Sequence, residues 1–585
     1  MAFTLFVLAF LAVCATIVVQ CLPQSVLTLL PDSKEDATLP KGFLWAVILI
    51  LLAFNAYAYD AESVAIGVGL FGAFSCLGLF AALPAAKRTF FAWAALGIGV
   101  VASLAFGFRA NEFVQAVNVI TALLAVGALF LLHAVERIEW NALWLLRTIF
   151  FYPSVFLHRV PGAFRMLKKS KVSGFGMALR VIGITVVLLV FFTIVLSSAD
   201  PIFAQKISIL REQIVPRTLW SLVLAVFLLV VLVASFSSRY TYKPLPLKFI
   251  SWLEAAVPVG AVCVLFGVFL WVQGTYLFAD HESFQALDLT YAEYVRKGMI
   301  ELLIATFCAG LLSYVLSLKE REQAGTYEAN VLRGVNAVLL IELFLMLASA
   351  WRRDVLYMDV YGLTRVRLIG EIFLAWLAVL VVLFAVFGMW RRLQEKAVFA
   401  GVIAASFAVV VYLNAFNMDA KIVAAEPPAG QQQDVYYMSL LSVDAVEGWW
   451  AMLGTMAAEF ETMRTKTTLL PEERMRLASI VRSVQEIAEK RRQLESSSID
   501  QSWTSWRWSD AYALSAMRGS TKFAYFSESL DCLLNETGDY RWLHDVDLSS
   551  EISSLQYDYR RPFVLEASTY DYGAVVADGR VTSCL

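Results

Sequence analysis

Long apolar runs recur along the first 416 residues of the chain, and short polar connections separate them. Each run has about 17 residues or more, the length at which an α-helix crosses a hydrocarbon core of about 30 Å. Backbone groups in lipid must be paired within the protein, so we interpret continuous runs of this length as helices. The pattern predicts twelve transmembrane helices, at residues 2–20, 43–59, 63–85, 90–107, 114–133, 177–197, 218–236, 251–273, 298–317, 331–350, 368–389 and 397–416.

The apolar runs stop after residue 416, and the rest of the chain has the pattern of an acidic, water-soluble segment. Residues 418–585 carry 25 Asp and Glu against 16 Lys and Arg. Acidic residues follow Pro471, and apolar residues then recur at mostly helical spacing, which predicts an amphipathic helix. We therefore predict an all-α polytopic membrane protein, with a transmembrane helical bundle at 1–416 and an extramembrane, mostly helical C-terminal domain at 417–585.

Composition agrees with this pattern, since 59% of the 585 residues are hydrophobic and only 16% are charged. Such values are typical of a protein that lies in a bilayer. Lys and Arg favour connections on the cytoplasmic side. Of the two alternating sets of connections, one contains 20 Lys and Arg and the other contains 10. This bias predicts that the richer set lies inside, so both termini and the C-terminal domain lie outside the cytoplasm.

The connection at 134–176 combines an apolar stretch, NALWLLRTIFFYPSVFL, with a basic run that ends at Lys171. This combination predicts an interfacial amphipathic segment on the inner leaflet, with the cations of residues 159–171 near anionic lipid headgroups. Ordinary anchoring by positive residues on the cytoplasmic side is the alternative. Nucleic acid is not predicted as a partner, because the chain has no separate basic domain and no aromatic-basic module.

The motifs that mark metal-binding and catalytic sites are absent from the sequence. Its four His residues are scattered and its cysteines form no C-x-x-C pair, so no metal site is predicted. The sequence also lacks the glycine-rich nucleotide motifs and the G-x-S-x-G turn of many hydrolases. No cofactor and no catalytic residue are therefore assigned, and enzymes without such motifs stay an open alternative.

Glu342 is the one carboxylate that lies well inside an apolar run, LLIELFLMLA. An ionisable group at membrane depth is costly, and it marks a functional candidate. We expect Glu342 to face the interior of the bundle. Its companion would be Asn336 of the same helix or a polar group on a neighbouring helix.

A second set of candidates flanks the helices predicted at 331–350 and 368–389. Several arginines there lie on the predicted outer side, against the orientation rule, and acids of the 274–297 connection lie on the same side. Pairing of these groups would join the two connections, as a charge-paired lid without a ligand. The alternative is an anion site for phosphate- or carboxylate-bearing lipid or sugar. The candidate residues are Arg352, Arg353, Asp359, Arg365, Arg367, Asp280, Asp288 and Glu293.

Cys532 and Cys584 are the two cysteines of the C-terminal domain, for which we predict a compartment that permits disulfides. A bridge between them would tie the end of the chain to its helix-rich part. It would close a loop of about 50 residues and contribute roughly 3–4 kcal/mol in the chain-entropy model. Two unrelated thiols are the alternative.

Several motifs resemble those of a known family. They are GTYLF, LTYAEYVRKGMIELL, LYMDVYGLTRVR, SSADPIFAQKI, NAFNMDAKIV, DVYYMSLLSVDAV and WTSWRWSDAYALSAM. They extend over most of residues 135–520, and the chain resembles the bacterial polytopic membrane proteins grouped as domain-of-unknown-function family 4153/4173. The resemblance implies a multi-pass helical protein of the bacterial inner membrane, and the family name carries no activity.

Three functions compete at this point. The first is a non-catalytic scaffold or sensor of the cell envelope that presents its extracytoplasmic domain to a partner protein. The second is a transporter or channel for a small or lipid-like anion, which twelve helices and Glu342 favour. The third is a membrane-embedded glycan or lipid transferase that uses an acid of an outer connection as a base.

Overall fold

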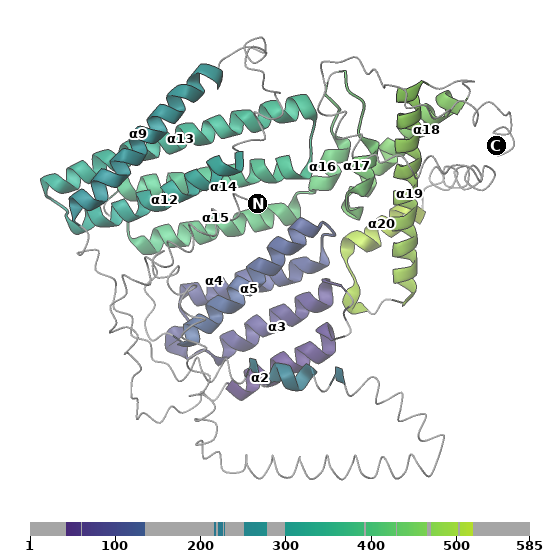
Figure 1. Cartoon of the computed structure of the whole chain (residues 1–585). Coiled ribbons are helices and arrows are strands. Elements are labelled where there is room, and N and C mark those ends of the chain that lie inside the picture. The colour runs from purple at the N-terminus through teal and green to yellow at the C-terminus, as the bar shows by residue number, and fades with distance from the viewer. Residues whose placement is uncertain are drawn as a thin grey trace, which may run out of the picture. The chain divides into compact units, whose positions relative to one another are not determined.

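The computed structural model describes residues 43–134, 251–277 and 299–518, together with short parts of 216–228. Single positions or short stretches inside the first and third ranges are not described: 60, 62, 391–392, 429, 465–469 and 501–502. Every element within the described ranges is a helix (Figure 1). The predicted all-α class is therefore confirmed for this part of the chain.

Seven of the described helices are long and apolar enough to cross a membrane, so the protein has the helices of a multi-pass membrane protein. They are α4 (Phe90–Leu104, continued by the 3-10 helix η4, Ala105–Gly107), α5 (Glu112–Ala134), α9 (Trp252–Leu277), α12 (Met299–Glu322), α13 (Tyr327–Tyr361), α14 (Arg365–Met389) and α15 (Glu395–Ala415). Two shorter apolar segments are α2 (Phe43–Ala53), which continues as the π-helix η2 (Phe54–Ala58), and α3 (Ile66–Ala82).

These nine helical segments coincide with nine of the predicted apolar runs. The runs predicted at 2–20 and 177–197 lie outside the described residues, and so does much of the run at 218–236. The interfacial segment predicted at 134–176 lies outside them as well, apart from its first residue.

Helix α13 is longer than the apolar run that predicted it. We expected Arg352, Arg353 and Asp359 in a connection, and they instead occupy the last turns of this 35-residue helix. At about 1.5 Å per residue such a helix is roughly 52 Å long, well beyond a hydrocarbon core of about 30 Å. Hydropathy marks the depth of the bilayer and not the end of the helix. The helix ends at Gly362, whose φ of 75° suits glycine.

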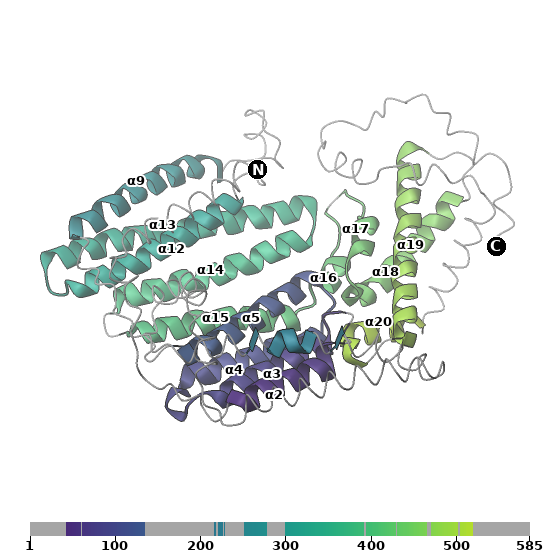
Figure 2. The same cartoon turned by 60° about the horizontal axis from the view of Figure 1, so that its bottom comes forward.

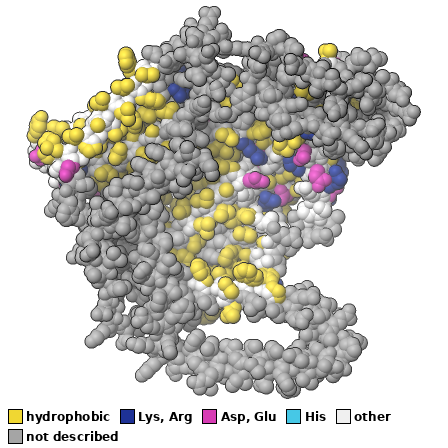
Figure 3. Space-filling model, viewed as in Figure 1, with side chains coloured by type: hydrophobic (Ala, Val, Ile, Leu, Met, Phe, Trp, Pro, Cys, Tyr) yellow, Lys and Arg dark blue, Asp and Glu magenta, His cyan; other side chains and the backbone are white. Residues whose placement is uncertain are grey.

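The membrane helices pack around two main apolar cores. One joins α2–α5 and contains the fully buried Leu79 and Leu129. The other joins α9 with α12, α13 and α14 and contains Leu343 and Leu377. The outward faces carry large exposed apolar side chains, and Figure 3 shows charged side chains gathered where these helices meet the helical segment 418–518.

Helices α3 and α4 approach each other through small residues. A Cβ on Gly69 would lie 2.3 Å from the carbonyl oxygen of Ser103, and a Cβ on Gly72 would lie 2.6 Å from the Ser103 hydroxyl. Glycine is therefore required at position 69, because the backbone of α4 occupies the space that any side chain would need.

Cations cap helix C-termini on the side opposite to residues 418–518. The Lys87 ammonium donates to the carbonyl oxygen of Leu132 near the end of α5 (3.0 Å). The Arg321 guanidinium donates to the carbonyl oxygens of Phe387, in the last turn of α14, and of its C-cap Trp390 (3.3 Å). Positive charge at a helix C-terminus satisfies free carbonyl groups and stabilises the helix dipole.

The C-terminal helices, α16–α20 with the 3-10 helices η6 and η7 between them, follow α15 directly. They are α16 (Met418–Ala424), α17 (Val435–Leu440), η6 (Val443–Ala445), α18 (Val446–Arg464), α19 (Pro471–Asp500), η7 (Trp503–Ser505) and α20 (Trp508–Arg518). Helix α19 contains the predicted amphipathic helix and buries Ile480 and Ile487. In both views these helices lie beside the ends of α5, α14 and α15 (Figures 1 and 2).

The core of the C-terminal helices also includes residues from membrane helices. It is built around Trp449, whose side chain is fully buried and whose indole N–H donates to the carbonyl oxygen of Met438 (2.9 Å). The same cluster includes Val114 of α5, Leu368 of α14 and Leu413 of α15. The ends of the membrane helices and the C-terminal helices therefore share one apolar core.

We expect Gly69→Ala to lower the free energy of unfolding by about 1–3 kcal/mol, because the added methyl group must push α3 away from α4. Gly97→Ala in α4 is the matched control, since no atom lies within 4 Å of its Cβ position. That variant should be neutral or more stable by up to about 1 kcal/mol. Thermal unfolding in detergent micelles, followed by circular dichroism, measures both. Equal midpoints for the two variants would contradict the close approach.

Candidate functional site

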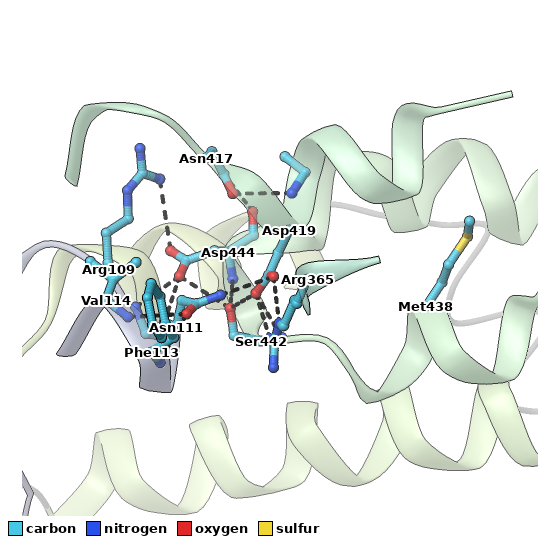
Figure 4. Close-up of polar contacts among 12 residues, drawn as sticks. Arg109, Asn111, Phe113, Val114, Arg365, Asn417, Asp419, Met438, Ser442 and Asp444 are labelled. Carbon is cyan, nitrogen blue, oxygen red and sulfur yellow. Dashed lines mark hydrogen bonds and ion pairs between the residues drawn. The ribbon is translucent and has the colours of Figure 1, made fainter. Parts of the chain in front are cut away.

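A buried group of charged side chains lies where the C-terminal helices meet the membrane helices. We call it the joint and define it by Arg109, Asn111, Arg365, Asp419, Ser442 and Asp444 (Figure 4). Its residues come from the α4–α5 connection, the first residue of α14, helix α16, and the start of η6. Segments more than 300 residues apart in the sequence therefore meet in one place.

Local capping sets the positions of these side chains. The Asn111 side-chain oxygen accepts from the backbone N–H groups of Phe113 (3.0 Å) and Val114 (3.2 Å) at the start of α5. The Asn417 side chain accepts from the Ala420 N–H (3.0 Å) and caps α16. Asn is a favoured residue at such helix starts, so the joint is assembled from ordinary helix caps.

Asp419 is the centre of the joint and is completely buried. Arg365 donates to it with two nitrogens, Nε to Oδ1 at 2.7 Å and Nη2 to Oδ2 at 2.6 Å. Asn111 Nδ2 donates to Oδ1 (3.0 Å), and the Ser442 backbone N–H donates to Oδ2 (3.1 Å). A bidentate Arg pair with further donors on both oxygens is the arrangement that makes a buried carboxylate tolerable.

Asp444 is buried as well, but its two oxygens have unequal surroundings. Oδ2 accepts from the backbone N–H groups of Ala110 (2.9 Å) and Asn111 (2.8 Å). Among the residues that the structure describes, Oδ1 has no hydrogen-bond partner, and Arg109 Nη1 is 3.8 Å away from it. Burial raises the pKa of the Asp444 carboxyl, while the nearby Arg109 lowers it. Asp444 is therefore the less compensated of the two acids.

One hydroxyl group lies between the two carboxylates. Ser442 Oγ is within hydrogen-bond distance of Oδ2 of Asp419 and of Oδ2 of Asp444, the latter at 3.1 Å. A hydroxyl has a single hydrogen and can donate to only one of them. A proton on Asp444 would let that carboxyl donate to Ser442 Oγ, which agrees with the direction of its pKa shift.

Arg109 and Arg365 also tie the joint to backbone groups of other helices. Arg109 Nε donates to the carbonyl oxygen of Asn414 (2.8 Å), and Nη2 donates to that of Ala415 (2.9 Å), at the end of α15. The backbone N–H of Arg365 donates to the hydroxyl of Tyr437 in α17 (2.9 Å). Each arginine therefore fixes one membrane helix end relative to the C-terminal helices.

Lys490 of α19 lies close to the charged groups of the joint, Arg365 and Asp419. Its ammonium donates to the carbonyl oxygen of Ser439 and lies 5.4 Å from the ring centre of Trp449. Burial lowers the pKa of Lys490, while Glu486 raises it. The apolar core of the C-terminal helices and the charged joint therefore meet at this lysine.

The predicted polar cluster is only partly brought together. Arg365 lies in the joint, and its carboxylate partner is Asp419. Arg367 is buried, donates to the carbonyl oxygen of Tyr361 (2.8 Å) and stacks 4.2 Å from the ring centre of Tyr357, so it caps the end of α13. Arg353 is buried, whereas Arg352 and Asp359 are exposed. The candidates that lie outside the described residues are Asp280, Asp288, Glu293, Cys532 and Cys584.

Glu342 belongs to α13 and points toward α9. Its Oε1 is 3.5 Å from the position that a Cβ on Gly267 of α9 would take, and its carboxyl interacts with Cys263, also of α9. Oε2 is buried and has no hydrogen-bond partner among the described residues. The companion is thus a group on a neighbouring helix and not Asn336, whose amide bonds with Ser313 (2.7 Å) and Ser317 (2.9 Å) of α12.

Sequence reasoning missed Asp419, Asp444 and Arg109 as candidates. Asp419 and Asp444 belong to two of the motifs that carry the family resemblance, NAFNMDAKIV and DVYYMSLLSVDAV. Those motifs were the available signal, because single acids just beyond an apolar run are common. The described residues contain no group of three or more His, Cys, Asp or Glu that could hold a metal ion.

A family model described as domain of unknown function (DUF4153) matches residues 94–449, which is more than half of the chain. The chain belongs to the DUF4153 family. The resemblance seen in the motifs is thereby confirmed. The part that matches the DUF4153 model includes every residue of the joint and ends before α19 and α20. No curated protein and no solved structure matches the chain.

The two acids of the joint should respond differently to neutralisation. Asp419→Asn removes one partner of a buried ion pair and leaves Arg365 uncompensated, so we expect a loss of about 3–5 kcal/mol. Asp444→Asn keeps an oxygen for the two backbone donors and removes a charge that is poorly compensated. We expect that variant to lie within about 1 kcal/mol of the wild type. Thermal unfolding in detergent micelles measures both.

The Asp444 variant also has an expected pH dependence. A raised pKa in the folded state means that the Asp444 contribution to stability is present below the usual value of 3.8 and is lost as pH rises through the raised value. Asn stays neutral throughout. The stability of Asp444→Asn relative to the wild type should therefore increase as pH rises from about 4 toward neutrality. A decrease over that range would contradict the assignment.

Proposed function

We propose that this DUF4153 protein is a non-catalytic scaffold or sensor of the bacterial inner membrane. In this proposal its transmembrane bundle presents the C-terminal domain to a partner protein of the cell envelope, outside the cytoplasm. The observation that carries the proposal is the bidentate pair between Arg365 at the start of α14 and the completely buried Asp419 of α16. A displacement of either helix must move the other, because separating them would leave two charges unpaired.

The arrangement of helix ends supports the proposed orientation. The C-terminal helices contact the starts of α3, α5 and α14 and the end of α15. With twelve spans and both termini outside, all four of these ends lie on the outer side. The basic residues Lys87 and Arg321 cap helices at the other ends, as expected for the cytoplasmic side.

The joint fits mechanical coupling better than catalysis. Asp419 is fully buried, and donors occupy both of its oxygens. A general base must reach a substrate proton, which such a carboxylate cannot do without breaking its ion pair. In the proposal, the segment 159–171 adds a second anchor at anionic lipid of the inner leaflet.

Site-specific photo-crosslinking in cells tests the proposal. A benzophenone amino acid at Gln493 or Ser496, on the exposed side of α19, should give a discrete adduct with another protein. The same probe at Leu123, an exposed apolar position of α5, is the control and should react with lipid. Asp419→Asn should reduce the α19 adduct to background, while Asp444→Asn should retain it. If no position on the C-terminal helices gives a protein adduct, the scaffold function is wrong.

A transporter or channel for a small or lipid-like anion is the second candidate, and Glu342 favours it. The carboxyl lies between two membrane helices, and one of its oxygens has no partner in the described part of the chain, so it could carry a proton that accompanies the anion. Liposomes with the purified protein should then show flux of chloride, phosphate or acetate that Glu342→Gln abolishes. Glu328→Gln, in the first turn of α13, is the control and should keep the flux. Absence of flux in the wild type would exclude this candidate for those anions.

A further inference from the structure

Three tryptophans lie within six residues at η7 and the start of α20. Trp503, Trp506 and Trp508 are 59%, 46% and 47% exposed. Tyr512 stacks on Trp508, with ring centres 5.2 Å apart, and extends the same aromatic surface. We call these four residues the tryptophan surface. Large aromatic side chains are rarely left half exposed to water in such a group, so the surface needs an occupant.

The backbone of this segment is held tightly against two apolar helices. Thr504 and Ser505, between the tryptophans, are buried. A Cβ on Gly67, in the first turn of α3, would lie 2.7 Å from both the Cβ and the carbonyl oxygen of Thr504. The Ile66 N–H donates to the carbonyl oxygen of Trp506 (3.3 Å). The tryptophan surface is therefore fixed at the level where α3 begins.

The contact of Trp503 with η2 places the tryptophan surface at the same position along the apolar helices. The ring of Trp503 meets that of Tyr57 edge to face, with centres 5.6 Å apart. Tyr57 in turn stacks on Phe74 of α3 (5.6 Å). The apolar helix α2–η2 ends at Ala58, so Trp503 lies beside the end of one apolar helix and the start of the next.

We infer that the tryptophan surface lies in the headgroup layer of the bilayer, so that the C-terminal helices rest on the membrane through a direct contact with phospholipid. The depth is that at which apolar helices end, and Trp and Tyr favour this layer because their rings are apolar with one polar atom. Arg507 Nε donates to Asp510 Oδ2 at 2.9 Å, and the hydroxyl of Tyr512 donates to the exposed carboxylate of Glu447, so the charge that touches the surface is negative. The attraction is therefore aromatic, and we expect it to need no anionic lipid.

Lipid photo-crosslinking of the full-length protein in nanodiscs of phosphatidylcholine tests this inference. A phospholipid with a diazirine near the glycerol backbone should label the tryptic peptides that end at Arg507 and Arg518, which contain the tryptophan surface. The peptide with the buried Trp449 should stay unlabelled and is the control. Absence of label on both tryptophan peptides overturns the inference.

Fluorescence quenching gives an independent measurement. Trp503→Phe, Trp506→Phe and Trp508→Phe together remove three of the 16 tryptophans. The triple variant should lose emission that a headgroup spin-labelled phosphatidylcholine quenches, whereas Trp449→Phe should lose emission that this lipid does not reach. If the lost emission is quenched by aqueous acrylamide and not by the lipid, the surface faces water and the inference is wrong. If neither agent quenches it, another protein surface covers the tryptophans, which also overturns the inference.

Discussion

A charge that leaves water must be matched by another charge, and the fold of the described chain is arranged around one such match. The carboxylate of Asp419 has no exposed surface, and the Arg365 guanidinium holds it with two hydrogen bonds. An isolated charge at that position would cost several kcal/mol, whereas a pair at the surface contributes about 1 kcal/mol or less. The start of α14 and the start of α16 are therefore held in one geometry.

The rest of the joint follows from that match. The amide nitrogen of Asn111 donates to the Asp419 carboxylate, and its amide oxygen accepts from the Val114 N–H at the start of α5. One residue therefore caps a membrane helix and adds a donor to the ion pair. Arg109, two residues earlier, donates to the carbonyl oxygen of Asn414 at the end of α15. The apolar core then continues without interruption from Val114 into Trp449 and α19. Polar and apolar contacts thus bind the same two parts of the chain.

The parts of this architecture that depend on local sequence could be predicted. Nine apolar runs correspond to described helical segments, and the amphipathic pattern after Pro471 corresponds to α19, because burial in lipid or against a core imposes a period on the sequence. The ends of helices were less predictable. Arg352 and Asp359 continue α13 out of the apolar region, since a helix in water needs no hydrophobic surface to keep its hydrogen bonds.

Pairing between distant residues could not be predicted in the same way. Arg365 was a candidate because it stood against the orientation rule, but its partner Asp419 lies 54 residues away, and a sequence pattern does not specify contacts at that distance. The same holds for Arg109 and Asp444. What the sequence contained was a resemblance in the motifs around Asp419 and Asp444, which marked the right segments without indicating their chemistry.

The contact between Asn111 and Asp444 has a consequence for biosynthesis, because 333 residues separate them. The α4–α5 connection is synthesised early, and all the later described helices must be synthesised before its partner in η6 exists. The N–H groups of Ala110 and Asn111 gain their acceptor, Asp444 Oδ2, only after η6 has been synthesised. The joint is therefore complete only after the chain has been synthesised through η6. A chain that stops before α16 leaves Arg109 and Arg365 without their carboxylates.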